Sequence, residues 1–144
     1  MFNTKIKDLM ACDPEFISAD ATLEEAAEKM SKIDCGVLPV GDEDNIEGII
    51  TDRDIVIRAI AKGKDPANET VKTHMTKVVY RCKESVTLQQ AAQQMQKHKV
   101  CRLIVEDNSG EATGMLSLGH ILRENTDAAE VSNVIELVAG RQAA

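Results

Sequence analysis

The sequence predicts a mixed α+β fold, built from two copies of one β-α-β-β-α unit and completed by a short C-terminal helix. The chain repeats itself at a spacing of about 65 residues, which indicates the duplication of one supersecondary unit. Each copy is too small to bury its hydrophobic face well, so we expect the copies to pack sheet to sheet about a pseudo-twofold axis, with a cleft between them. The columns that agree include Lys7/Lys72, Thr22/Thr87, Leu23/Leu88, Ala26/Ala91, Ala27/Ala92, Met30/Met95, Lys32/Lys97, Leu38/Leu103 and Val40/Val105 and, after one inserted residue, Gly48/Gly114, Thr51/Ser117 and Ile55/Ile121.

The first copy opens with an extended segment, Phe16–Ser18, and then begins a helix at Thr22. Thr22 is followed three positions later by Glu25. This spacing is that of a capping box, which satisfies free N–H groups at a helix N-terminus. Gly36 marks the end of this helix. Its apolar residues fall on one face at helical spacing: Leu23, Ala26, Ala27, Met30 and Ile33.

A hairpin and a second helix complete the first copy. Buried strands are predicted at Val37–Val40 and Ile46–Ile50, around a polar turn at 41–45. Thr51 then opens a helix that ends at Gly63, a residue suited to a C-cap. The apolar stripe of this helix is Ile55, Val56, Ala59 and Ile60.

The second copy repeats this order after a linker at 62–70 that contains glycine, proline and asparagine. A last helix fits after Asn125, with an apolar stripe that either folds back on the module or contributes to a dimer. That stripe is Val131, Val134, Ile135 and Val138. The predicted elements of the second copy are an extended segment at 78–80, a helix at 87–99, strands at 102–106 and 114–116, and a helix at 117–124.

Composition excludes several classes of protein. A net charge of −7 and the near absence of aromatic residues, with no Trp, one Tyr and two Phe, argue against nucleic-acid binding. No run approaches the roughly 18 apolar residues of a membrane span, and the first ten residues lack a signal-peptide core, so we expect a cytoplasmic protein that does not bind membranes. The four cysteines and three histidines do not show the spacing of metal ligands, so no metal site is expected.

The order of elements resembles that of the CBS domain, named for cystathionine β-synthase. The resemblance is carried by Gly48–Asp54, read Gly-Ile-Ile-Thr-Asp-Arg-Asp, where a strand runs directly into a helix, and by Lys7–Met10, Ala21–Ala26 and Leu38–Val40. It implies a stand-alone tandem pair, often called a Bateman module, with one repeat at 8–65, a second at 73–128 and a helical tail at 129–144. In many members of this family the clefts bind adenosine-containing ligands such as AMP, ADP, ATP, NAD or S-adenosylmethionine. Members made of little besides the pair often form a flat homodimer of four CBS units.

The candidate site of the first copy is the helix start at Thr51. A helix N-terminus offers free N–H groups and a positive dipole end, which suit phosphate, and Arg53 offers a bidentate fork to the same group. Asp54 can accept two hydrogen bonds from a ribose diol, and the Thr51 hydroxyl can bond ribose or phosphate. In the family that the chain resembles, this Thr and this Asp are the usual ribose contacts. The same pair also fits an ordinary capping box, which satisfies the N–H groups without any ligand.

The second copy departs from this pattern. Ser117 keeps the hydroxyl, but His120 stands where the carboxylate would be, and a neutral imidazole cannot hold a diol as a carboxylate does. We therefore expect the second site to be weaker, empty or specialised for a more anionic ligand. Arg102 lies where many family members place a phosphate-contacting arginine, whereas Val37 in the matching column offers only backbone and an apolar wall.

An enzyme is the least supported class, because no catalytic triad, Cys-His pair, P-loop or metal cluster is present in the sequence. The leading hypothesis is a regulatory module that senses an adenine nucleotide and signals to an unknown effector protein by changing the conformation of the module or its dimer. The alternative is a constitutive interaction module whose clefts stay empty.

Overall fold

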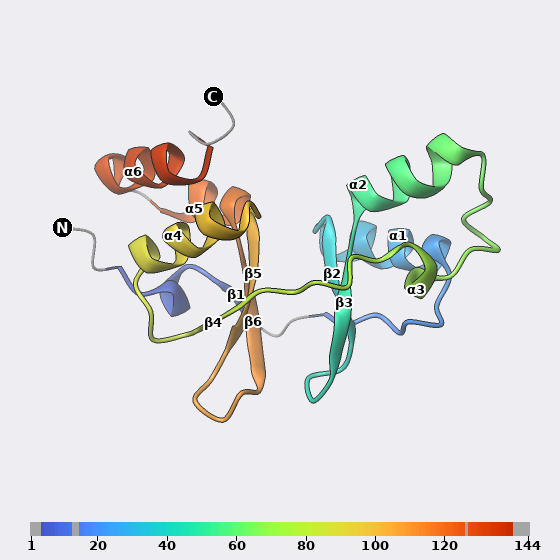
Figure 1. Cartoon of the computed structure of the whole chain (residues 1–144), viewed down its shortest axis with the longest axis horizontal. Helices are drawn as coiled ribbons and strands as arrows, with labels where there is room; N and C mark the ends of the chain where they lie inside the picture. The colour runs from blue at the N-terminus through green and yellow to red at the C-terminus, as the bar shows by residue number, and fades with distance from the viewer. Residues whose placement is uncertain (1–3, 13–14, 126, 140–144) are drawn as a thin grey trace. The chain divides into compact units, whose positions relative to one another are not determined.

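The computed structural model describes residues 4–12, 15–125 and 127–139. It divides the chain into two compact units. We call residues 14–79 the repeat-1 unit, and residues 1–13 together with 80–144 the repeat-2 unit. In each unit the helices lie on one face of the sheet (Figure 1). The mixed α+β fold that the sequence predicts is confirmed.

In the repeat-1 unit, a β-hairpin separates two helical segments along the chain. Its elements are α1 (Leu23–Ile33), β2 (Val37–Gly41), β3 (Ile46–Thr51), α2 (Asp52–Asp54) and α3 (Val71–His74). α2 continues without a break through a π-helical turn, Ile55–Ala59, and a 3-10 turn, Ile60–Lys62, so the Thr51 helix runs over residues 52–62 and ends at Gly63 with φ 73°. The predicted C-cap is confirmed.

The repeat-2 unit holds a sheet of four described strands in the order β1-β6-β5-β4, in which β4 and β5 are parallel and the other pairs antiparallel. The elements are a 3-10 turn (Ile6–Asp8), β1 (Ala11–Cys12), β4 (Arg81–Lys83), α4 (Leu88–His98), β5 (Arg102–Glu106), β6 (Ala112–Ser117), α5 (Leu118–Glu124) and α6 (Ala128–Ala139). The segment predicted as extended at 78–80 ends directly before β4.

The repeat-1 unit contains a reduced form of this sheet, with two paired strands and a single β-bridge on each side. β2 and β3 pair over five positions, while Ile17 bridges Val40 in parallel and Thr76 bridges Ile49 in antiparallel. Gly48 lies beside this last bridge, because a Cβ there would stand 2.5 Å from the carbonyl oxygen of Thr76. The outer lines of this sheet are single bridges, so the sequence-predicted segment at 16–18 is extended without forming a longer strand.

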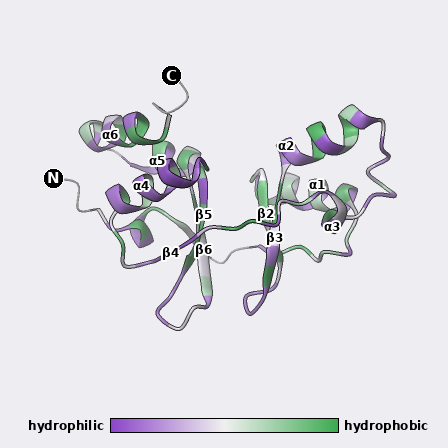
Figure 2. Cartoon of the chain, in the orientation of Figure 1, coloured by the Kyte–Doolittle hydropathy of each residue, from purple (hydrophilic) through white to green (hydrophobic). Residues whose placement is uncertain are grey.

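Each unit has its own hydrophobic core. In α1 the predicted stripe is only partly buried: Leu23, Ala26 and Met30 face the core, whereas Ala27 and Ile33 are exposed. The Thr51 helix likewise buries Ile55 and Ala59 and leaves the other half of its stripe exposed. Figure 2 shows the resulting run of hydrophobic residues along the helix that begins at α2.

The C-terminal helix α6 packs back onto the repeat-2 unit. Val134 and Val138 are fully buried in the same core as Ala92 and Met95 of α4. The sequence left open whether this stripe folds back on the module or contributes to a dimer. Val134 and Val138 fold back on the module, while Ile135 stays exposed.

Candidate ligand-binding site

The Thr51 helix start is assembled by the β2–β3 hairpin. Thr51 is both the last residue of β3 and the N-cap of α2, and the strand register places it opposite Val37. Both residues are buried. The candidate site residues Thr51 and Val37 are therefore brought together on adjacent strands, with Arg53 exposed and Asp54 half-buried on the helix that follows.

The capping box predicted at this corner is fully formed. The Thr51 hydroxyl accepts a hydrogen bond from the Asp54 amide at 3.0 Å, and Asp54 Oδ2 accepts one from the Thr51 amide, also at 3.0 Å. These two bonds satisfy N–H groups that a helix start otherwise leaves free. They also fix the Asp54 side chain, which is 13% exposed.

The other oxygen of Asp54 faces a residue that the sequence analysis did not select. Arg58 Nη2 lies 3.6 Å from Asp54 Oδ1, one helical turn further along. An acidic residue followed four positions later by a basic one is a recognised stabilising pair on a helix, so this spacing could have identified Arg58. Arg58 also donates from Nη1 to the carbonyl oxygen of His74 at 2.8 Å.

The repeat-2 unit contains the matching corner. Arg102 on β5 stands opposite Ser117 on β6, the same register as Val37 and Thr51. Ser117 is the N-cap of α5, and its hydroxyl accepts from the His120 amide at 3.1 Å. The Nε atom of Arg102 is buried and has no hydrogen-bond partner among the described residues. The structure thus places Arg102, Ser117 and His120 together.

Within the described residues, no group of three or more His, Cys, Asp or Glu side chains is arranged to hold a metal ion. Of the helices described, none combines the length and the apolar character that crossing a bilayer requires. The Thr51 corner offers hydroxyl, carboxylate and guanidinium groups, and the Ser117 corner offers hydroxyl, imidazole and guanidinium groups. Such groups are suited to the hydrogen-bonding surface of a polar organic ligand.

The sequence model of the CBS domain matches the chain twice, at residues 6–60 and 71–127. The chain belongs to the CBS domain family. As a CBS pair, it is similar to protein YlbB of Bacillus subtilis, with 34% identity over 140 residues that cover 95% of this chain and 93% of YlbB. Hypoxic response protein 1 of Mycobacterium tuberculosis is 34% identical over 103 residues, covering 71% of this chain and 72% of that protein.

Solved structures of CBS pairs share this fold. The CBS pair of protein MJ0100, in complex with 5′-methylthioadenosine and S-adenosyl-L-methionine, aligns with a TM-score of 0.73 and 28% identity over 84% of this chain and 94% of that chain. Hypoxic Response Protein I, solved with two coordinated zinc ions, aligns with a TM-score of 0.70 and 31% identity over 85% of this chain and 99% of that chain. CBS pairs at this level of similarity therefore include one that holds adenosine compounds.

Proposed function

We propose that this CBS pair is a regulatory module, without catalytic activity, that senses an adenosine-containing ligand of the class AMP, ADP, ATP, NAD or S-adenosylmethionine at the start of the Thr51 helix. The observation that carries the proposal is the fixed, half-buried carboxylate of Asp54 at a helix N-terminus in a family member. The adenosine compounds held by the MJ0100 pair support this ligand class. The signal would pass to a separate effector protein in the cytoplasm.

The chemistry of the corner suits a ribose. A carboxylate oxygen has two lone pairs, so Asp54 can keep its bond to the Thr51 amide and still accept from a diol hydroxyl. The exposed fork of Arg53 and the helix dipole favour a nearby phosphate or carboxylate. At the matching corner, Arg102 with Ser117 and His120 offers a cation and no carboxylate, which favours a more anionic ligand and weaker binding of ribose.

Sensing requires that the ligand bind one conformation of the module or its dimer more tightly than another. Ligand occupancy then shifts the population toward that conformation by the difference in binding free energy. Without such a difference, a bound nucleotide would stabilise the fold and transmit nothing.

The test is a titration of the intact chain with AMP, ADP, ATP, NAD and S-adenosylmethionine by calorimetry, together with thermal unfolding. A true ligand at a hundredfold excess over Kd should add about 2.7 kcal/mol to the free energy of unfolding. Asp54→Asn keeps an oxygen for the capping box but removes the charge, and should weaken binding by about tenfold to a hundredfold, since hydrogen bonds to charged groups contribute roughly 1.5–3 kcal/mol.

The matched control is Asp52→Asn, which removes a carboxylate two positions away on the exposed side of the same helix. It should leave the affinity nearly unchanged. If no compound of the panel stabilises the chain, or if both variants weaken binding equally, the Asp54 site is not the one proposed.

We also propose that the module forms a homodimer through the exposed apolar side of the Thr51 helix. Val56, Ile57 and Ile60 are 47% to 53% exposed, and Val56 borders a hollow of about 410 Å³ that Met30 also lines. Surface residues of this size, clustered on one helix, are typical of association surfaces. Should the nucleotide panel fail, this surface supports the alternative function, a constitutive interaction module.

Sedimentation equilibrium of the intact chain tests the dimer. Val56→Glu should shift the protein to monomer, whereas Leu122→Glu, at the matching position of the other repeat, should not. A monomer in the unmodified chain, or equal effects of the two substitutions, would exclude this surface.

A further inference from the structure

Arg58 connects the candidate ligand carboxylate to the end of α3. One guanidinium nitrogen lies 3.6 Å from Asp54 Oδ1, and the other donates to the His74 carbonyl oxygen at 2.8 Å. We propose that Arg58 is a positioning residue that couples occupancy of the Asp54 site to residues 70–79, the segment through which the chain leaves the repeat-1 unit. The response to a nucleotide rests on the function proposed above, whereas the link from Asp54 to α3 does not.

The two oxygens of Asp54 have different partners. Oδ2 accepts a direct hydrogen bond of 3.0 Å within the capping box, while Oδ1 has the longer ion pair with Arg58. An ion pair at 3.6 Å is beyond normal hydrogen-bond distance and is the weaker of the two contacts. A hydroxyl that donates to Oδ1 would therefore compete with Arg58. The Arg58 side chain is 45% exposed, so its guanidinium can turn to water when displaced.

The His74 end of this link is the last residue of a four-residue helix. Carbonyl groups at a helix C-terminus lack intrahelical partners, and a guanidinium donor forms a stronger bond than a neutral one. So short a helix depends on contacts from outside itself. The imidazole of His74 is also bonded, to Glu69 at 2.7 Å, so Arg58 and Glu69 together fix the residue at which α3 ends.

Beyond α3, the segment returns to the sheet of the same unit. Thr76 exchanges two backbone hydrogen bonds with Ile49, at 2.8 and 2.9 Å, and Ile49 lies two residues before Thr51 on β3. A shift at His74 would act on this pair first. The amides of residues 72–79 therefore report on the Arg58 contact.

The second repeat does not carry the same link. Its residues at the columns of Asp54 and Arg58 are His120 and Glu124, an imidazole and a carboxylate. Neither can supply the guanidinium fork that joins a carboxylate to a backbone carbonyl. The coupling belongs to the repeat-1 unit, and Glu124 offers a matched control position.

Hydrogen–deuterium exchange of the intact chain tests the link, with AMP as the nucleotide probe. Without AMP, Arg58→Ala should speed exchange of residues 72–79 roughly fivefold, the change expected for the loss of one hydrogen bond. Asp54→Asn should act in the same direction, and the double variant should exchange no faster than Arg58→Ala. Arg58→Lys should restore part of the protection, and Glu124→Ala should leave this segment unchanged.

With AMP, exchange of residues 72–79 should change in the unmodified chain but not in Arg58→Ala, although Arg58→Ala keeps the Asp54 carboxylate and still binds AMP. The inference is overturned if Arg58→Ala exchanges like the unmodified chain, if the effects of Asp54→Asn and Arg58→Ala simply add, or if AMP acts equally on both proteins. If AMP does not bind but the two substitutions remain non-additive, AMP is excluded as the ligand of the Asp54 site and the link from Asp54 to α3 stands.

Discussion

Ile6 and Val71 occupy the same column of the two repeats, and each is fully buried in the core of the unit built on the other repeat. Ile6 is the first residue of the first CBS match, but it packs with Leu88 of the second. Val71 is the first residue of the second CBS match, but it packs with Leu23 of the first. The leading segments of the two repeats are thus exchanged.

Equivalent backbone bridges accompany this exchange in both units. Lys5 bridges Thr87, and Thr70 bridges Thr22, so each leading segment pairs with the N-cap residue of the helix it packs against. A unit that lacked its borrowed segment would leave these backbone groups unpaired and part of its core in contact with water.

The first prediction concerns the borrowed segment of the repeat-1 unit. A fragment spanning residues 14–79 should unfold cooperatively in urea, because it contains Val71 and the Thr76 pairing with Ile49. A fragment ending at residue 69 should not, since it loses both. Circular dichroism through a urea titration measures the difference. Equal cooperativity in the two fragments would show that the exchanged segment contributes little to this core.

The second prediction compares two neighbouring residues of α6. Val134 is fully buried and Ile135 is 44% exposed. Val134→Ala should lower the free energy of unfolding of the intact chain by about 2 kcal/mol, from lost burial and the cavity left behind. Ile135→Ala should change it by less than about 0.5 kcal/mol. Similar losses for both would mean that α6 is covered on both sides, as in a tight dimer.

Much of the fold could be predicted from local signals. Thr22 and Thr87 cap α1 and α4 as their spacing indicates, and β5 has the predicted bounds. Such features depend on neighbours a few positions apart, which the sequence displays directly. The exchange of Ile6 and Val71 could not be predicted, because the two repeats carry similar apolar residues at this column and either core would accept either side chain. α3 lies just after the predicted linker and was not predicted for a similar reason: a four-residue helix held by outside contacts leaves little periodic pattern.

The candidate site shows the same division. The capping box at Thr51 and the pairing of Arg102 with Ser117 follow from spacing and strand order. The contact between Arg58 and the His74 carbonyl does not, because it joins a helix to a backbone atom sixteen positions away that has no side-chain signature.

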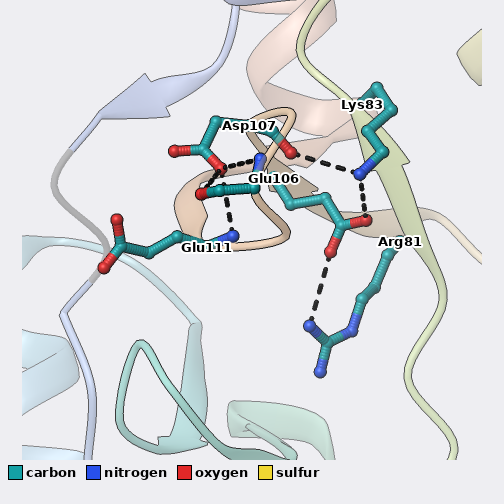
Figure 3. Close-up of polar contacts among 6 residues, drawn as sticks. Arg81, Lys83, Glu106, Asp107 and Glu111 are labelled. Carbon is teal, nitrogen blue, oxygen red and sulfur yellow. Dashed lines mark hydrogen bonds and ion pairs between the residues drawn. The ribbon is translucent and has the colours of Figure 1, made fainter.

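The third prediction concerns acid stability and the hairpin between β5 and β6 (Figure 3). The Asp107 carboxylate accepts hydrogen bonds from the Ser109 hydroxyl and from the Glu111 amide, which lower the pKa of Asp107 below its ordinary value of 3.8. Because this pKa is lower in the folded state than in the unfolded chain, the ionised carboxylate stabilises the fold at pH values above the ordinary pKa. This stabilisation is lost as the pH falls through the folded pKa.

Urea unfolding between pH 5 and pH 2.5 checks this sign. Asp107→Asn removes the carboxylate that acid protonates. The free energy of unfolding of this variant should therefore fall less steeply with acid than that of the unmodified chain. Ser109→Ala removes the largest cause of the shift and should move the acid-sensitive range to higher pH. An acid profile of Asp107→Asn that matches the unmodified chain would contradict the assignment.

The fourth prediction concerns Cys82, the central residue of β4. Burial raises the pKa of the Cys82 thiol from 9.0 to about 11, and the nearby charge of Glu106 adds to the shift. Glu106 is itself held by Lys83 at 3.0 Å and by Arg81 at 3.5 Å, as Figure 3 shows. Because the folded state keeps its proton longer than the unfolded chain, the free energy of unfolding should decrease as the pH rises from about 9 to about 11.

Alkylation by iodoacetamide, followed residue by residue with mass spectrometry, measures this shift. Only the thiolate reacts, so at pH 8 a thiol with a pKa two units higher carries roughly one-hundredth of the thiolate. Cys82 should react far more slowly than the exposed Cys35, and its rate should keep rising up to about pH 11. Glu106→Gln should lower this midpoint only partly, because burial is the larger cause. A Cys82 rate that levels off near pH 9 would show that the strand does not shield the thiol.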